Sequence, residues 1–352
     1  MKTPIMTPLE QFAGKVLNDI GAAASGALVI LGDRLGIYES LAKSGSVTSA
    51  ALAALTQVDE RYLREWLSAQ AASGYIEFDP ATETFSMTAE QIAVFADPNH
   101  PAAMTGGYYG ISSMYHDEPL IEQAFRTGDG VPWGDHHNCL FCGTERFFRA
   151  GYAAYLVNAW LPSLDGVVDK LAAGARVADV GCGHGASTIL MAQSFPKSRF
   201  VGFDLHEGSI TTARLHAAEQ GVSNCRFEVA TAKNFPGTGY DLVTIFDALH
   251  DMGDPVGAAA YIRSTLAPDG TWMIVEPMAG DSLAENLNPV GRVYYSFSTM
   301  ICTPGSRSQE VGLALGAQAG EKRLRKVVTE GGFTRFRRAT ETPVNLILEA
   351  RP

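Results

Sequence analysis

A glycine-rich turn at residues 177–185 is the part of the sequence best suited to ligand chemistry. It reads Val-Ala-Asp-Val-Gly-Cys-Gly-His-Gly, and a helical pattern follows from Ser187 to Ser194. Glycines let the backbone approach a ligand closely, and the helix behind them presents free N–H groups. Alone, such a turn could equally hold a dinucleotide. It predicts a small-molecule cofactor site without naming the cofactor.

Two aspartates make this turn more specific. Asp179 lies at the end of the strand before the turn, where a carboxylate can meet an ammonium group. Asp204 ends the next predicted strand, where a carboxylate can accept hydrogen bonds from both hydroxyls of a ribose. Because both strands end at the same edge of the predicted sheet, we expect the two carboxylates to serve one ligand.

Two further polar residues follow later strands. His250 comes just after the predicted strand 242–246, and Glu276 ends the strand at 272–275. A histidine with a pKa near neutrality is a natural general base, whereas the alternative is that His250 only caps a helix or packs against the ligand. Glu276 could orient His250 or an acceptor, or serve the fold alone. We take both as candidate catalytic residues.

Strand-like and helix-like runs alternate from Ala175 onward, which is typical of a parallel sheet flanked by helices. The predicted strands are 176–180, 199–203, 226–229, 242–246 and 272–275, and 334–339 with 344–349 predict an antiparallel hairpin at the sheet edge. This α/β arrangement brings the glycine turn, the aspartates, His250 and Glu276 to one cleft.

The first hundred residues predict a second, mostly α-helical domain. A helical pattern runs from Leu9 to Ala42, and shorter helices at 48–55 and 59–73 are followed by β-like runs at 75–78 and 84–87. Asp59 can cap the last of these helices with its side chain. Helices followed by a hairpin in this order are the layout of a winged helix-turn-helix.

The pattern from Ala175 onward resembles the class I S-adenosylmethionine (SAM) dependent methyltransferases. The glycine turn, the two aspartates, the strand at 241–246, the Leu-Ala-Pro-Asp-Gly run at 266–270 and the hairpin carry the resemblance. It implies a Rossmann-like sheet with one antiparallel strand and SAM across the carboxyl ends of the first strands. Asp179 would bind the methionine amino end, the turn the methionyl moiety and Asp204 the ribose. The cofactor contacts implied are Asp179, Gly181, Cys182, Gly183, Asp204, Leu205, Thr231, Ala232 and Asp247.

One residue departs from that family pattern. Many members carry an acidic residue after the third strand, near the adenine amino group, where this sequence has Thr231. A threonine hydroxyl can still accept that hydrogen bond. The adenine pocket is therefore the least typical part of the predicted cofactor site.

The His-Asp pair at 250–251, together with the winged helix, is similar to the plant-type small-molecule O-methyltransferases. In that group the histidine is the base and the winged-helix domain mediates dimerisation. The resemblance implies a homodimer that uses SAM to methylate a small organic acceptor, with oxygen favoured. Transfer to nitrogen or carbon, a SAM-responsive winged-helix regulator and an inactive SAM-binding scaffold remain open alternatives.

A chain of 352 residues exceeds the usual size of one domain. We predict a winged-helix dimerisation domain at 1–98, a helical linking region at 99–168 that contributes to the acceptor pocket, and a SAM-binding domain at 169–352. The aromatic segment 133–155 is expected to line that pocket or pack the linking helices. The long connection 286–310 is expected to form a lid or a dimer contact.

Charge argues against nucleic acid as a partner. The formal net charge is −11, and residues 51–97 carry two positive and eight negative side chains. The predicted recognition helix has only Arg61 and Arg64 as basic residues. Because neutralisation of phosphates dominates affinity for DNA, this surface is poorly suited to it.

Cysteine usage and hydropathy point to the cytoplasm. Five unpatterned cysteines in so long a chain favour a reducing compartment. The apolar run 20–32 is too short to span a bilayer, and we expect it to be the buried part of an N-terminal helix. The His-His-Asn-Cys-Leu-Phe-Cys run at 136–142 contains half of a zinc knuckle, but no second Cys pair has that spacing, so we predict no metal.

Overall fold

The computed structural model describes residues 6–352, which form two compact units. Unit 1 contains the residues up to Ser112 together with Cys142–Ala150, and unit 2 contains Ser113–Phe141 and Gly151–Pro352. Two helices contribute to both units, α6 (Thr105–Thr127) and α7 (Cys139–Tyr155). The predicted linking region, 99–168, is thus divided between the two units.

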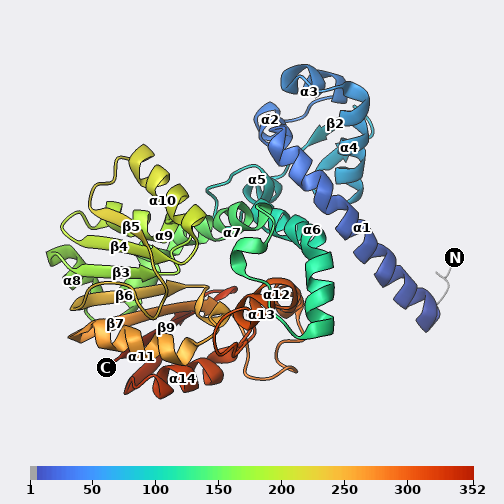
Figure 1. The fold of residues 1–352 in the computed structure, drawn as a ribbon. Coiled ribbons are helices and arrows are strands. Elements are labelled where there is room, and N and C mark those ends of the chain that lie inside the picture. Colours follow the sequence, from blue (N-terminus) through green and yellow to red (C-terminus); the bar gives the residue numbers. More distant parts are fainter. Residues whose placement is uncertain (1–5) are drawn as a thin grey trace. The chain divides into compact units, whose positions relative to one another are not determined.

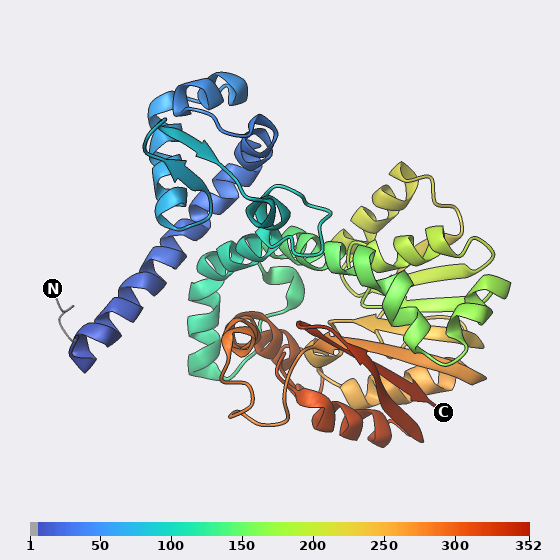
Figure 2. The same cartoon turned by 180° about the vertical axis from the view of Figure 1, so that it is seen from behind.

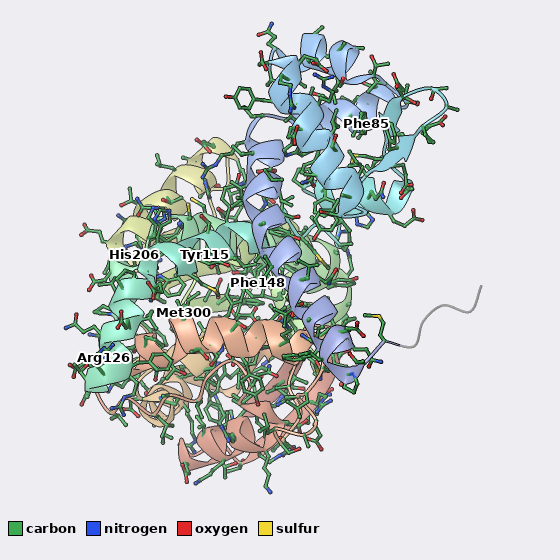
Figure 3. All side chains as sticks on the ribbon, turned by 90° about the vertical axis from the view of Figure 1, so that its right-hand side faces the viewer. Phe85, Tyr115, Arg126, Phe148, His206 and Met300 are labelled. Atoms are coloured by element: carbon green, nitrogen blue, oxygen red, sulfur yellow. The ribbon has the colours of Figure 1, made fainter. Side chains whose placement is uncertain are left out.

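Unit 1 is a helical domain closed by a small hairpin (Figure 1). Its elements are α1 (Pro8–Arg34), α2 (Ile37–Ser44), α3 (Ser49–Thr56), α4 (Glu60–Ala72), β1 (Glu77–Asp79), β2 (Thr84–Ser86) and α5 (Ala89–Phe95). Asp59 caps α4 as predicted, because its side chain accepts the N–H groups of Arg61 and Tyr62 at 3.0 and 3.2 Å. Phe85 of β2 is buried in the core of this unit (Figure 3).

The single helix predicted over Leu9–Ala42 is wrong. The helix ends at Arg34, and α2 begins only after Gly36, whose φ of +64° lies in the left-handed region. Glycine adopts that conformation without a Cβ penalty, so it turns the chain between the two helices. Gly32 near the end of α1 has a packing reason, since a Cβ there would lie 2.4 Å from the Trp66 ring.

The N-terminal helix α1 is only partly covered. Only Ser25, Gly26, Val29 and Gly32 of the run 20–32 are buried and most of its other residues are exposed, so the prediction that this run is buried is wrong for most of its length. Earlier in the helix, a stripe of large apolar side chains is exposed: Leu9, Phe12, Val16, Leu17 and Ile20. By length and composition α1 is also the one helix of the described residues that could cross a membrane, with 22% of its apolar window buried.

Unit 2 is built on a seven-stranded sheet with the order β5-β4-β3-β6-β7-β9-β8 (Figures 1 and 2). The strands are β3 (Arg176–Val180), β4 (Arg199–Asp204), β5 (Cys225–Val229), β6 (Tyr240–Phe246), β7 (Leu266–Pro277), β8 (Arg335–Glu341) and β9 (Asn345–Arg351). Strands β3 to β7 pair in parallel, and β9 is antiparallel to both neighbours. The predicted α/β sheet and its closing hairpin are confirmed, with β9 lying between β7 and β8.

Helices cover both faces of this sheet. One core cluster joins α11 (Pro255–Thr265) and α14 (Gly320–Glu330) to strand residues such as Val201 and Phe203. The other joins α9 (Ala186–Ser194) and α10 (Glu207–Glu219) to Phe227 of β5. Alternate residues of a strand point to opposite faces, so Gly202, between Val201 and Phe203, faces this second cluster. A Cβ there would meet Phe227 at 2.5 Å, which explains the glycine.

The sheet has a topological switch point between β3 and β6. The chain runs from β3 outward to β4 and β5, then returns to place β6 on the other side of β3. In open α/β sheets, ligands bind at the carboxyl ends of the strands at such a point. This edge carries all the residues that the sequence predicts for the cofactor and the base.

The connection 286–310 is helical rather than irregular. It contains α12 (Pro289–Phe297), a π-helical turn at Ser298–Cys302 and α13 (Thr303–Arg307). Tyr294 is buried and donates to the carbonyl of Val344 at 2.9 Å. This segment therefore packs into unit 2 through its own side chains, while a lid or dimer-contact role for it stays a prediction.

Candidate active site

The glycine turn after β3 is held open by its backbone. Gly181 and Gly183 have φ values of +74° and +52°, and the N–H groups of Gly181 and Cys182 both donate to the carbonyl of Phe203, at 2.7 and 3.0 Å. A Cβ on Gly183 would meet no atom within 4 Å, whereas one on Gly181 would lie 3.0 Å from Ala248. The turn therefore leaves open space beside Gly183 in which a ligand can approach the backbone.

Asp179 lies beneath this turn as a fully buried carboxylate. Its Oδ2 accepts the hydroxyls of Ser187 and Thr188 at 2.7 and 2.6 Å, and its Oδ1 accepts Thr244 at 2.9 Å. Burial raises the pKa of this carboxyl, and the three hydroxyl donors oppose that shift. In the structure Asp179 ties β3, α9 and β6 together, and its contact with an ammonium group stays a prediction.

Asp204 is positioned at the end of β4 by two backbone donors. The N–H of Gly183 donates to Oδ2 and the N–H of His206 to Oδ1, both at 2.9 Å. Burial raises the pKa of the carboxyl, while these two hydrogen bonds lower it. Each oxygen keeps a further lone pair, so the carboxylate can still accept two ribose hydroxyls.

The remaining predicted cofactor contacts lie along the same edge. Leu205, directly after Asp204, is 53% exposed. Thr231 follows β5 and donates its hydroxyl to Oδ1 of Asn234 at 3.0 Å, and its oxygen accepts the N–H of Lys233 at 3.4 Å, which leaves one lone pair for an amino group. Ala232 packs half-buried against the main core cluster of the sheet.

Asp247, the first residue after β6, has an unusual backbone. Its φ is +49°, a left-handed conformation that costs energy for a residue with a Cβ. Three contacts hold it there: its N–H donates to Val275 O at 2.8 Å, Asn345 donates to Oδ1 at 2.8 Å and Tyr152 to Oδ2 at 3.2 Å. Burial, with the nearby charge of Glu276, raises the pKa of this carboxyl well above its usual range.

His250 lies in a short 3-10 turn, Leu249–Asp251, with 3% of its surface exposed. Its Nδ1 is 2.8 Å from Oε2 of Glu276, whose Oε1 accepts the N–H of Leu249 at 3.0 Å. A carboxylate can only accept, so Nδ1 carries a hydrogen and Nε2 is the atom free to take a proton. The structure thus brings the two predicted catalytic residues into direct contact.

The other side of the His250 ring faces a second carboxylate. Its Nε2 is 3.2 Å from Oδ1 of Asp251, a contact of charges rather than a well-aligned hydrogen bond. Burial lowers the pKa of His250, but the charges of Asp251 and Glu276, and then Cys302, outweigh burial and raise that pKa well above its ordinary value. The imidazole therefore holds its proton to a higher pH than an ordinary histidine does.

These residues together fit a cationic cofactor. Asp204 and Asp247 are half-buried carboxylates whose charge is disfavoured by burial, and Glu276, whose charge acts on Asp247, has 1% of its surface exposed. A ligand with ammonium and sulfonium charges would compensate this cluster, whereas an anionic dinucleotide would be repelled. That the glycine turn, Asp204, Thr231 and Asp247 hold SAM stays a prediction.

Four residues of this cluster were not predicted as site residues from the sequence. Tyr152 and Asn345 hold Asp247, and Asp251 and Cys302 contact His250. Asp251 carried a signal, since it forms the His-Asp pair with His250. Tyr152 belongs to the aromatic segment 133–155, which was expected to line the acceptor pocket or pack the linking helices, whereas no local pattern marks Asn345 and Cys302.

The possible metal ligands at 136–142 do not gather around one point. His136 contacts Asp117 instead, with Nδ1 2.9 Å from Oδ2. Within residues 6–352, the one group with metal-ligand spacing is His250, Asp251 and Cys302, whose ligand atoms lie within 4.8 Å of one another. Their mutual hydrogen bonds and charges already account for that proximity.

Comparison with known proteins agrees with this geometry. Residues 171–332 match the family model described as a methyltransferase domain, and residues 23–96 match the Rv2258c-like winged HTH domain. The ubiquinone biosynthesis O-methyltransferase of Neisseria meningitidis is 33% identical over 116 residues, which is 31% of this chain and 46% of that protein. The chain spans about half the length of the curated relatives it matches.

Solved structures match over almost the whole chain. The mitomycin 7-O-methyltransferase MmcR has a TM-score of 0.67 at 20% identity, covering 99% of this chain and 100% of that one. Human N-acetylserotonin methyltransferase, solved with SAM, has a TM-score of 0.71 at 18% identity, covering 98% and 99%. At these identities the likeness establishes the fold. The two domain matches show that the chain carries a methyltransferase domain at 171–332 and an Rv2258c-like winged HTH domain at 23–96.

Proposed function

We propose that this protein transfers the methyl group of SAM to a hydroxyl of a small organic acceptor. The observation that carries the proposal is the His250–Glu276 pair at the carboxyl ends of β6 and β7, on the same sheet edge as the glycine turn and Asp204. Bound SAM supplies an electrophilic methyl group on a cationic sulfur. The chain supplies a base for the acceptor proton and a buried acidic surface for the cationic cofactor.

His250 acts as the general base in this proposal. Its Nε2 takes the hydroxyl proton while the acceptor oxygen attacks the methyl carbon, and Glu276 keeps the hydrogen of the other ring nitrogen in place. Glu276 also stabilises the imidazolium that results, because its carboxylate lies 2.8 Å from Nδ1. Asp251 adds a second negative charge beside the same ring.

The direct test is methyl transfer from radiolabelled SAM to a panel of phenols, alcohols, amines and thiols. We expect an O-methylated product, identified by mass and NMR spectra, and unchanged rates in EDTA, because His250 Nε2 acts without a metal. N- or C-methylated products would show that the enzyme methylates nitrogen or carbon instead of oxygen. Tight SAM binding without turnover, together with sequence-specific retardation of DNA, would instead favour a regulator.

The pH dependence follows from the raised pKa of His250. Only the deprotonated ring can accept the acceptor proton, so kcat/KM is expected to rise with pH, about tenfold per unit, and to level off at a higher pH than an ordinary histidine would give. Asp251→Asn removes one of the two charges that raise this pKa, so the rising limb should move to lower pH. The base role would be contradicted if kcat/KM did not change from pH 6 to 9, or if Asp251→Asn did not shift the pH range over which kcat/KM rises.

We also propose that a second copy of the chain covers the exposed stripe of α1. Leu9, Phe12, Val16, Leu17 and Ile20 recur at helical spacing, and four of them are at least 60% exposed. Light scattering should give twice the 37.6 kDa chain mass, and Phe12→Asp with Leu17→Asp should reduce it to one chain. Lys15→Gln, in the same stretch of helix, is the matched control. A monomeric wild type would refute the interface.

A further inference from the structure

A buried histidine–carboxylate pair lies in unit 2 outside the residues already assigned to the cofactor and the base. Asp117 of α6 is 5% exposed, and its Oδ2 lies 2.9 Å from Nδ1 of His136, which follows the 3-10 turn at Trp133–Asp135. Asp117 also accepts the backbone N–H of His137 at 3.1 and 3.2 Å. Because the carboxylate accepts, Nδ1 of His136 carries the ring hydrogen and Nε2 carries a lone pair.

That Nε2 atom is buried and has no hydrogen-bond partner among residues 6–352. The His136 side chain is completely buried. A buried nitrogen left without a donor is disfavoured, and such atoms are rare in folded proteins. The His136 ring is thus oriented by Asp117 through Nδ1, while its Nε2 has no hydrogen-bond donor in the described part of the chain.

His136 belongs to a segment that runs between the base and the ribose carboxylate. At one end, the N–H of Val131 donates to the carbonyl of Pro304 at 3.0 Å, two residues beyond Cys302, which contacts His250. At the other end, the Phe141 ring stacks on His206 with centroids 4.8 Å apart, and His206 donates its N–H to Asp204. His206 is labelled in Figure 3.

Two observations place His136 toward the reacting end of this segment. Burial raises the pKa of the Asp251 carboxyl and His250 opposes that shift most strongly; a protonated His136 would oppose it as well, so the two side chains lie within range of each other's charge. Trp133 meets the His136 ring edge-on, with centroids 6.4 Å apart, and meets Phe141 in the same way at 5.5 Å. His136 is therefore the polar group within an aromatic segment, near the carboxylate that contacts the base.

We propose that Nε2 of His136 accepts a hydrogen bond from a second O–H or N–H of the acceptor, separate from the hydroxyl that is methylated. The inference rests on the proposed function and narrows its substrate class to flat molecules with at least two donor groups, such as dihydroxylated aromatics. His136 is then a specificity-determining residue. An acceptor that lacks the second donor leaves Nε2 unpaired in the complex, which is how buried polar sites reject such analogues.

The test compares matched acceptors that differ by one hydroxyl: catechol with phenol, 2,3-dihydroxynaphthalene with 2-naphthol, and caffeate with p-coumarate. For the wild type we expect kcat/KM to be about 10- to 100-fold higher for the dihydroxy member of a pair. His136→Phe should lower this ratio to within about threefold, by slowing only the dihydroxy acceptor. His136→Gln, which retains an oxygen near the position of Nε2, should keep part of the preference.

Controls separate this inference from the proposed function. His137→Phe, next in the chain and stacked on His116 at 4.0 Å, should keep the wild-type ratio, and all variants should bind S-adenosylhomocysteine equally. The role of His136 would be overturned, and the proposed function left standing, by either of two results. The wild type could methylate both members of every pair at equal rates, or His136→Phe could lower kcat/KM equally for both members. No turnover of any acceptor by a protein that binds the cofactor would overturn the proposed function and this inference with it.

A second measurement needs no acceptor. Nitrogen-15 NMR of the histidine rings should show the His136 hydrogen on Nδ1 in the wild type, with that preference weakened in Asp117→Ala. A hydrogen on Nε2 would overturn the proposal, because that atom would then donate rather than accept.

Discussion

Replacing His250 with alanine is expected to lower kcat by about 10²- to 10⁴-fold while the dissociation constant for S-adenosylhomocysteine stays within about threefold of the wild type. The ring nitrogen proposed to take the acceptor proton is lost, but His250 lies beyond the glycine turn and Asp204, which are proposed to hold the cofactor. Radiometric methyl transfer gives kcat, and calorimetric titration gives the dissociation constant.

Glu276→Gln is the companion variant, since it keeps a hydrogen-bond acceptor for Nδ1 and removes the charge. We expect a loss about tenfold or smaller in kcat, with the rising limb of the pH profile moved toward lower pH. Such a shift would mark Glu276 as a positioning residue acting through His250, because a purely structural role would leave the limb in place. Wild-type kcat in His250→Ala would show that alignment of the two reactants suffices without a base.

Asp204→Ala is expected to weaken binding of S-adenosylhomocysteine by about 100-fold or more. The substitution removes charge-assisted hydrogen bonds to the ribose hydroxyls, each worth about 1.5–3 kcal/mol. It also releases the N–H groups of Gly183 and His206, which hold the turn in place at 2.9 Å each. Calorimetry measures the effect directly, and thermal unfolding confirms that the variant is folded.

Asp241→Ala is the matched control for Asp204. It removes an aspartate at the other end of the sheet, where Oδ2 of Asp241 accepts the N–H of Arg176 at 2.8 Å. We expect this variant to bind the cofactor product as the wild type does. If Asp204→Ala bound equally well, the ribose would be held elsewhere, and if the folded wild type bound none, the methyltransferase proposal would fail.

Much of unit 2 could be predicted because its signals are local. Apolar strand runs, the glycine turn and the strand-end polar residues each occupy a few consecutive positions, and parallel topology then brings them to one edge. The error in unit 1 was also local: the periodicity of Leu9–Ala42 continues through Gly36, but a left-handed glycine divides the helix there. Periodicity records which face is apolar and does not record such a turn.

The rest of the site depends on contacts that no short pattern encodes. Cys302 reaches His250 through a π-helical turn, Asn345 reaches Asp247 across 98 positions of sequence, and His136 meets Asp117 across 19. Sequence reasoning placed His136 in the segment 133–155, which was expected to line the acceptor pocket or pack the linking helices, and considered its side chain only as a poor metal ligand. Its buried carboxylate partner, and the nitrogen left without one, become visible only in three dimensions.

The left-handed backbone of Asp247 has a consequence for how this protein can change over evolutionary time. A glycine would hold the same φ of +49° with less strain, so the fold keeps a carboxyl group at this position at a cost of about 1–3 kcal/mol. Such positions are where selection for activity opposes selection for stability. A cofactor that binds only the folded state offsets this cost by mass action, so we expect the protein to resist unfolding best when SAM is abundant.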